Sequence, residues 1–136
     1  MNYLLDTNAC IALINSQPSS VRNRFRAAVA AGHSLFASSV AAFELWYGVA
    51  KSSQPENNRR RLQAFLRGPL ALLPFDEDDA EATGAIRARL EALGKPISAY
   101  DLLIAGQALR REFTLVTSNS REFARVKGLV WEDWSK

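Results

Sequence analysis

Three carboxylates of this chain stand apart from every other charge. Each is the only charged side chain of a long stretch, with the single histidine taken as neutral: Asp6 in residues 1–21, Glu44 in residues 27–50 and Asp101 in residues 96–109. A buried carboxylate is costly unless a cation or several hydrogen bonds compensate its charge. Because no Lys or Arg lies near these acids in the sequence, we expect the three to meet and to share a cation. An all-oxygen cluster of this kind suits Mg²⁺, with Mn²⁺ as a substitute.

Each acid also has a plainer structural interpretation. Asp6 follows a short apolar stretch and could cap the helix after it. Asp101 comes three residues after Ser98, a spacing that also fits a capping box. Glu44 has the weakest alternative, because it lies well inside an apolar helical stretch where no cap is needed.

Smaller or less isolated polar side chains accompany the acids. Glu122 either orients or deprotonates an attacking water at such a site, or makes a cap-like pair with Asn119. Thr7 and Asn119 each stand near the end of a predicted strand. They could position water or phosphate at a metal site, or could simply cap helices.

The composition is that of one domain, residues 1–136, with 48% hydrophobic residues to build a core. One cysteine excludes an internal disulfide framework and fits a reducing compartment. One histidine and no CxxC motif argue against a zinc site. The first apolar stretch contains Asp6 and lacks a basic leader, and no apolar run reaches the length of a membrane span. We therefore expect a cytoplasmic protein with no signal peptide and no membrane contact.

Positive charge is grouped along the chain, within a net charge of +3 and a pI of about 9.4. Arginines gather in four sets: Arg22, Arg24 and Arg26; Arg59, Arg60 and Arg61; Arg87 and Arg89; Arg110 and Arg111. Many acids cluster apart from them, in residues 76–81. An arginine-rich surface around an acidic, metal-binding centre suits a polyphosphate substrate. The alternative for any single set is a solvated helix face.

Short apolar stretches alternate with helical patterns along the whole chain. Strands are predicted at residues 3–5, 34–37, 70–75, 114–117 and 129–131. Helices are predicted at residues 8–15, 18–32, 39–51, 57–66, 78–94, 98–111 and 120–124, with Ser39 as one cap and Asp78 with Glu81 as a capping box. This alternation indicates an α/β fold with a central, mainly parallel sheet flanked by helices. Ligands bind beyond the carboxyl ends of such strands, where Asp6 falls and toward which Glu44 and Asp101 could project.

Other enzymes with this architecture fit the acids less well. A haloacid-dehalogenase-like phosphatase needs a second Asp two residues after its nucleophile, where this chain has Asn8. A receiver domain needs an acidic pair at the end of its first strand, where Asp6 stands alone. A non-catalytic RNA- or protein-binding module is a further alternative, and the presence of all three lone acids argues against it.

Four motifs follow one another across essentially the whole chain. They are Leu4-Leu5-Asp6-Thr7-Asn8; Ser38-Ser39-Val40 with Phe43-Glu44-Leu45 and Tyr47-Gly48; Ile97 with Asp101-Leu102-Leu103-Ile104-Ala105-Gly106 and Ala108; and Leu115-Val116-Thr117-Ser118-Asn119-Ser120-Arg121-Glu122-Phe123. Together they resemble the motifs of the PIN-domain ribonucleases, and among these the VapC toxins of bacterial toxin–antitoxin pairs. Any one motif is a weak signal, but four in order at compatible spacing are a strong one.

The resemblance implies a three-layer PIN-like fold and a Mg²⁺-dependent endoribonuclease that hydrolyses structured RNA, with tRNA as the leading class. It implies Asp6, Glu44 and Asp101 as active-site acids. Many family members carry a further Asp where this chain has Asn119, and the chain resembles a VapC subgroup with Asn there and Glu at the position of Glu122. A small VapB antitoxin is the implied partner, and we also expect a homodimer through apolar helix faces. A PIN nuclease of RNA processing that is not a toxin is the alternative.

Overall fold

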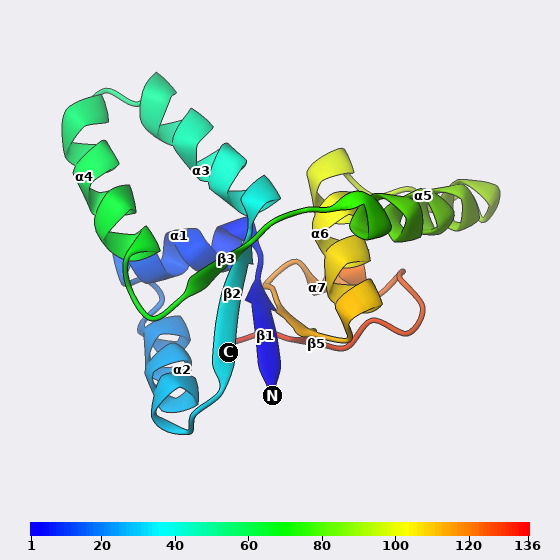
Figure 1. Ribbon diagram of the computed structural model, residues 1–136, viewed down its shortest axis with the longest axis horizontal. Helices are drawn as coiled ribbons and strands as arrows, with labels where there is room; N and C mark the ends of the chain where they lie inside the picture. The colour runs from blue at the N-terminus through cyan, green and yellow to red at the C-terminus, as the bar shows by residue number, and fades with distance from the viewer.

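Five parallel strands form the sheet at the centre of the molecule (Figure 1). The computed structural model describes the whole chain, residues 1–136. The strands are β1 (Asn2–Leu5), β2 (Ser34–Ser38), β3 (Ala71–Leu73), β4 (Thr114–Val116) and β5 (Trp131–Glu132). They lie in the order β3-β2-β1-β4-β5, and every pairing is parallel. The mainly parallel sheet predicted from the sequence is confirmed, with β1 at its centre.

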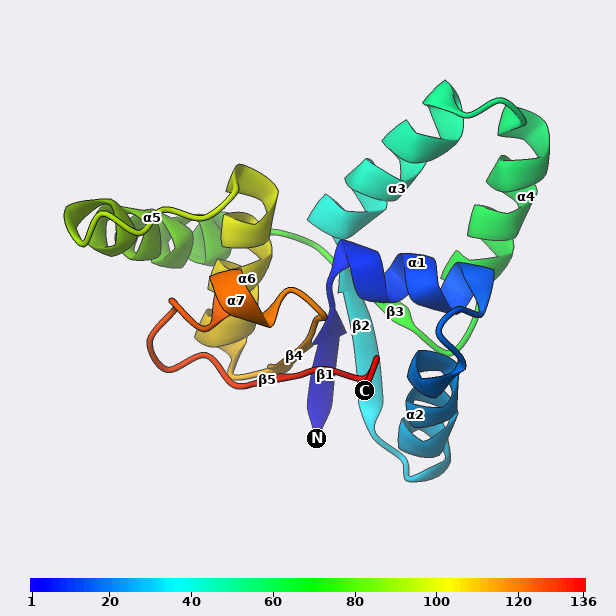
Figure 2. The same cartoon turned by 180° about the vertical axis from the view of Figure 1, so that it is seen from behind.

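Helices connect the strands and cover both faces of the sheet (Figures 1 and 2). They are α1 (Thr7–Asn15), α2 (Ser19–Ala30), α3 (Ser39–Lys51), α4 (Pro55–Leu66), α5 (Glu77–Ala92), α6 (Ala99–Arg111) and α7 (Ser120–Phe123). In both views α1, α2 and α4 lie to one side of the sheet, and α5, α6 and α7 lie to the other. None of these helices combines the length and the apolar character needed to cross a membrane.

The alternation of side chains along each strand explains the two apolar cores. In β1, Tyr3 and Leu5 pack with residues of α1 and α2, whereas Leu4 packs with residues of α5 and α6. In β4, Val116 and Leu115 divide between the two cores in the same way. Because helices cover both faces, the strands are apolar throughout rather than alternately polar.

The cap of α3 lies one residue earlier than predicted. The hydroxyl of Ser38 accepts the N–H of Val40 at 3.0 Å, so Ser38 rather than Ser39 caps the helix. The hydroxyl of Ser39 accepts the N–H of Phe75 at 3.0 Å instead. This bond ties the segment after β3 to the start of α3.

The capping box of α5 lies two residues earlier than predicted. Asp76 and Asp79 form it, in place of Asp78 and Glu81. The N–H of Asp79 donates to Oδ1 of Asp76 at 2.9 Å, and the N–H of Asp76 donates to Oδ2 of Asp79 at 3.0 Å. Both edge strands differ from their predicted ranges. β3 ends before Pro74, which has no N–H to donate, and β5 starts only at residue 131.

Arg110 and Arg111 hold α6 against α5. Nε of Arg110 lies 2.7 Å from Oδ1 of the fully buried Asp79, and Nη2 of Arg111 lies 3.1 Å from Oδ2. Burial opposes the ionisation of Asp79, but hydrogen bonds from Arg111, from the N–H of Asp76 and from Arg110 outweigh it and hold the pKa of Asp79 below its usual range. This arginine pair therefore stabilises the fold and does not form part of a polyphosphate-binding surface.

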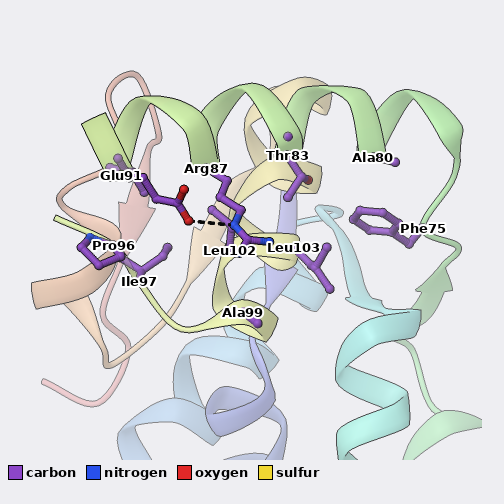
Figure 3. Close-up of a pocket in the computed structure, with 12 residues that line it drawn as sticks. Phe75, Ala80, Thr83, Arg87, Glu91, Pro96, Ile97, Ala99, Leu102 and Leu103 are labelled. Atoms are coloured by element: carbon purple, nitrogen blue, oxygen red, sulfur yellow. Dashed lines mark hydrogen bonds and ion pairs between the residues drawn. The ribbon is translucent and has the colours of Figure 1, made fainter. Parts of the chain in front are cut away.

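A cavity of about 570 Å³ opens between α5 and α6 (Figure 3). Its lining is mostly apolar and includes Ile97, Leu102 and Leu103, with the ion pair of Arg87 and Glu91 at its rim. None of the three lone acids lines it. The predicted site residues lie instead at the carboxyl edge of the sheet.

Candidate active site

β1 brings Asp6 to the carboxyl edge of the sheet, between β2 and β4. The N–H of Asp6 donates to the carbonyl of Val116 at 3.1 Å, so β4 still holds the backbone at this point. The residue is only 2% exposed. Its Oδ1 accepts the N–H of Ala9 at 2.8 Å, so Asp6 does cap α1, as one interpretation of the sequence held. The capping bond satisfies one carboxylate oxygen of Asp6. It does not explain why a buried acid lies here with no ion-pair partner.

Glu44 reaches the same edge from α3, the helix that starts directly after β2. Its side chain is half-buried, and its Oε1 accepts the hydroxyl of Thr7 at 2.6 Å. Thr7 is the residue after Asp6, so this bond ties the second acid to the first. Glu44 caps no helix, in agreement with the sequence, which left it the least structural role.

Asp101 and Glu122 form a second pair at this edge, from α6 and α7. Asn119 bridges them: its Nδ2 lies 3.2 Å from Oδ2 of Asp101 and 2.7 Å from Oε2 of Glu122. Asn119 stands at the N-cap position of α7, yet its side chain makes no capping hydrogen bond. The cap-like interpretation of Asn119 and Glu122 is therefore replaced by contacts between these two side chains and Asp101.

Ser98 belongs to the site, although the sequence indicates only a helix cap. Its side chain makes no capping hydrogen bond to α6. Instead its hydroxyl donates to Oδ2 of Asp101 at 2.9 Å, and its N–H donates to Oε1 of Glu122 at 3.4 Å. The capping-box interpretation of Asp101 is wrong. The three-residue spacing of Ser98 and Asp101 could have indicated this contact, because it brings the serine hydroxyl to the carboxylate.

Neighbouring acids shift the pKa values of Asp6, Asp101 and Glu122. Burial raises the pKa of Asp6, and the negative charge of Glu44 raises it further. Burial and contact with Glu122 raise the pKa of Asp101 to about 6, with a further contribution from Asp6. The hydrogen bond shared with Asp101 lowers the pKa of Glu122. The two pairs of acids therefore form one electrostatic site.

No basic side chain compensates this charge by an ion pair. The ion pairs of the structure involve other acids: Asp76, Asp79, Glu91 and Glu132. As they stand, no three His, Cys, Asp or Glu side chains converge closely enough to hold one ion. The lone acids thus lie at the same edge of the sheet but do not converge on one metal position. Their chemistry nevertheless fits a hard divalent cation, because the side chains gathered here offer oxygen donors and carry unpaired negative charge.

The chain is similar to known nucleases in sequence. The family model of the PIN domain matches residues 3–129. The chain is 42% identical to the tRNA(fMet)-specific endonuclease VapC of Shigella flexneri, over 99% of each of the two chains.

Solved structures resemble the fold closely. A chain of the VapBC2 complex of Rickettsia felis, bound to a DNA fragment from its promoter, superposes with a TM-score of 0.92 at 38% identity, over 98% of this chain and 99% of that one. A chain of the DNA-bound VapBC of Salmonella typhimurium superposes with a TM-score of 0.90 at 40% identity, over 98% of both chains. At this identity and coverage, the likeness extends to the whole arrangement of strands and helices.

Proposed function

Because the chain belongs to the PIN domain family, and within it to the VapC ribonucleases, we propose that it is a metal-dependent endoribonuclease. It acts as the toxin of a toxin–antitoxin pair, and residues 1–136 work as one domain. One observation carries the proposal: four carboxylates from separate elements share the carboxyl edge of a parallel sheet, and none of them is in an ion pair. The substrate is structured RNA, with tRNA as the leading class, since the Shigella flexneri relative is named as a tRNA(fMet)-specific endonuclease.

Asp6, Asp101 and Glu44 would hold the divalent cation, which is Mg²⁺ with Mn²⁺ as a substitute. When bound, such an ion offsets the charge of the phosphodiester and lowers the pKa of a bound water. The protein's part is to keep these oxygens oriented. The hydroxyl of Thr7 holds Glu44, and the amide of Asn119 holds Asp101 beside Glu122. Thr7 and Asn119 also position water or phosphate.

Glu122 orients or deprotonates the attacking water. The hydrogen bond that it shares with Asp101 lowers the pKa of Glu122, so its carboxylate is ionised at neutral pH. Donors from Asn119 and from the N–H of Ser98 fix the direction of this carboxylate. A fixed carboxylate with a lowered pKa is a weaker base than a free Glu, so this environment favours orientation of the water over its deprotonation.

Cleavage of tRNA by the purified, partner-free protein tests the proposal. We expect cleavage with Mg²⁺ or Mn²⁺ and none in EDTA, and sequencing of the RNA ends identifies the bond. The Asp101→Asn protein is the matched control for a contaminating nuclease. Undiminished cleavage in EDTA would exclude the metal mechanism. Binding of RNA and metal without cleavage would identify the chain as a decayed binding module.

A small antitoxin of the VapB type is the proposed partner, in a hetero-oligomer. The structures that this chain resembles are VapBC complexes. A cleft of about 320 Å³ between α1, α3 and α4 offers apolar side chains with Glu44 at its rim: Ile11, Ile14, Leu45, Val49 and Leu62. Such a cleft suits an amphipathic helix. An arginine of the partner could pair with Asp6 or Asp101 and compete with the metal.

Expression with and without the neighbouring small gene tests the partner. We expect growth arrest from this chain alone, rescue by co-expression, and a stable complex on gel filtration. Equal growth in both cases, with no complex, would refute the toxin–antitoxin assignment and leave the nuclease intact. The predicted homodimer stays a prediction, which sedimentation of the purified chain measures.

A further inference from the structure

A fifth acid, Asp133, lies at the carboxyl edge of the sheet beside the candidate site. It directly follows β5, as Asp6 directly follows β1, and β4 lies between these two strands. The N–H of Thr117, after β4, donates to the carbonyl of Glu132 at 3.0 Å, so the sheet is still paired at this level. Two strand spacings, or about 10 Å, therefore separate the backbones at Asp6 and Asp133. Burial raises the pKa of Asp6 most, and the charges of Glu44 and Asp133 raise it further.

The carboxylate of Asp133 is held in place by the turn that follows it. The N–H of Ser135 donates to Oδ1 of Asp133 at 2.9 Å, and the hydroxyl of Ser135 donates to the same oxygen. Burial opposes the ionisation of Asp133, but these hydrogen bonds outweigh it and hold the pKa of Asp133 below its usual range. Oδ2 accepts no hydrogen bond from the chain, and Asp133 takes part in no ion pair. The turn thus uses one oxygen and leaves the other, charged and oriented, without a donor.

Asp133 lines a cavity of about 180 Å³ between α1, the turn before α2 and the C-terminal segment. Buried apolar side chains lie at its floor, and exposed polar side chains lie at its rim: Ala9, Val21, Val116 and Trp134 at the floor, and Asn8, Gln17 and Ser118 at the rim. Asn8 is two residues after Asp6, and Ser118 directly precedes Asn119, so the cavity opens beside the acids. An apolar floor with a few fixed polar groups is typical of a site for a small ring. A ribose, with its carbon face and its hydroxyl groups, matches this lining.

The proposed hydrolysis makes no chemical use of the sugar. Water attacks the phosphorus, so the 2′-hydroxyl takes no part and the same chemistry would cut DNA. Selection of RNA must therefore come from binding, and the 2′-hydroxyl is the group that distinguishes RNA from DNA at a single nucleotide. This hydroxyl is a hydrogen-bond donor, and Oδ2 of Asp133 is an acceptor without one. A carboxylate near a phosphodiester strand is repulsive unless it accepts such a bond.

We propose that this cavity binds the ribose of a substrate nucleotide and that Oδ2 of Asp133 accepts the proton of its 2′-hydroxyl. The nucleotide lies within two residues of the phosphate that the acids hold. This inference rests on the proposed ribonuclease function and adds the residue that selects RNA over DNA. Asp133 touches the substrate away from the reacting atoms, so it acts on the choice of substrate.

Single sugar substitutions in the substrate test the inference. Once the cleaved bond is mapped, each nucleotide within two residues of it is replaced in turn by its 2′-fluoro form, which keeps the RNA sugar pucker but cannot donate a hydrogen bond. We expect one position at which the wild-type kcat/KM falls about 10- to 100-fold, the range for one hydrogen bond to a charged group. A 2′-deoxy nucleotide at that position should give a similar loss.

Asp133→Asn tests whether Asp133 makes that contact. The amide keeps an oxygen for the turn with Ser135 but replaces Oδ2 with an N–H₂ group, which cannot accept the hydroxyl proton. On the all-ribose substrate this variant should lose a factor similar to that of the 2′-fluoro substitution. On the 2′-fluoro substrate it should differ from the wild type by less than about three-fold, because the two changes remove the same bond.

Lys136→Gln is the matched control. It changes a charge of the same segment but does not line the cavity, and it should keep the wild-type ratio of rates on the two substrates. An Asp133→Asn protein that is slowed equally on all substrates would assign Asp133 to the acid cluster or to folding, and would overturn the inference. Wild-type rates that no 2′-fluoro position changes would also overturn it, without the need for any variant. Both results leave cleavage of RNA by the wild type intact, whereas a wild-type protein that cuts no RNA would refute the proposed function and the inference with it.

Discussion

Neutral donors, not cations, hold the acids of this site in place. The hydroxyl of Thr7 holds Glu44, and the hydroxyl of Ser98 and the amide of Asn119 hold Asp101. A neutral donor orients a carboxylate without cancelling its charge. The negative charge thus stays available for a metal ion, or for an arginine of an inhibitor.

Conversion of any lone acid to its amide should abolish cleavage while the protein stays folded. Asp6→Asn, Glu44→Gln and Asp101→Asn should each lower the cleavage rate by more than about 100-fold, which exceeds the usual cost of losing an orienting contact. In metal-free buffer their melting temperatures should equal or exceed that of the wild type, because like charges no longer repel. Rate assays on tRNA and thermal melts measure both. A variant with wild-type turnover would remove its residue from the site, and Glu122→Gln should be milder.

The bond from Thr7 to Glu44 gives a second expectation. Thr7→Val keeps the shape of the side chain but removes the donor, and should lower the cleavage rate by about 10- to 100-fold. Thr7→Ser keeps the hydroxyl and should stay close to wild type. Titration of the rate with Mg²⁺ should show a higher half-saturating concentration for Thr7→Val. Equal losses in both variants would instead point to packing of the threonine methyl group.

The sequence singles out the acids because the isolation of a charge is visible in the local pattern. It also singles out Thr7 and Asn119, but not the acid that each of them holds. Asn119 and Asp101 are 18 residues apart, and Thr7 and Glu44 are 37 residues apart. Which side chains meet across such distances depends on which strand ends are neighbours, and that order is set by the whole sheet.

α5 and α6 form one unit that carries Asp101 to the edge of the sheet. The helices approach closely at Gly106, where a Cβ atom would overlap the hydroxyl of Thr83. The buried Asp79 then joins the start of α5 to the arginines at the end of α6. The position of Asp101 therefore depends on contacts well away from the candidate site.

Asp79→Asn should destabilise this unit. Removing one partner of a buried pair costs about 3–5 kcal/mol, and we expect about 2–3 kcal/mol here because Arg110 and Arg111 reach solvent. Urea denaturation at pH 7 measures the loss. Arg87→Gln breaks the exposed pair with Glu91 and, as the matched control, should change stability by less than about 0.5 kcal/mol.

The same acid gives a pH dependence with a definite sign. The folded-state pKa of Asp79 lies below its usual value. Its contribution to stability is therefore complete above about pH 4, the range of an unfolded Asp, and is lost as the pH falls through the folded-state pKa. Stability curves of wild type and Asp79→Asn should converge below pH 4. Curves that stay parallel down to pH 2 would show that Asp79 is not ionised in the folded protein.

The sequence predicts the elements well and their ends less well. Either Ser38 or Ser39 could cap α3, and the choice follows from the pairing of Ser38 with Leu73, which extends β2 to that residue. Several acids stand at the start of α5, and the distant arginines of α6 pair with the two that form its capping box, Asp76 and Asp79. Local patterns offer the alternatives, and long-range contacts decide among them.

On the scale of the whole molecule, the net charge is positive although the candidate site is acidic. The net charge is +3, although the site itself carries four carboxylates without ion pairs. Of the arginines on α4, Arg59 and Arg60 are exposed and make no ion pair, whereas Arg61 donates to the carbonyl of Ile14 at 3.1 Å. The first two are therefore the free cations of this helix.

The double variant Arg59→Gln with Arg60→Gln should weaken RNA binding and its dependence on salt. For a single-stranded segment, each lost phosphate contact should reduce the slope of log K against log salt by about 0.7. Binding measured between 50 and 200 mM salt, in the Asp6→Asn background, gives the slopes. An unchanged slope would show that Arg59 and Arg60 lie on a solvated helix face and do not contact phosphate.

Arg61→Gln is the matched control for that experiment. Its guanidinium already bonds to the end of α1, at Ile14 and Asn15. The substitution should therefore lower thermal stability slightly and change the salt slope less than the double variant does. A full change of slope from Arg61 alone would place the phosphate contact there instead.

The place of β1 between β2 and β4 also determines when the candidate site can form during translation. Its acids are spread from residue 6 to residue 122, and the strand that closes the edge beside Asp6 is residues 114–116. A ribosome must translate most of the message before these parts can meet. The candidate site therefore cannot assemble until nearly the whole chain has been made.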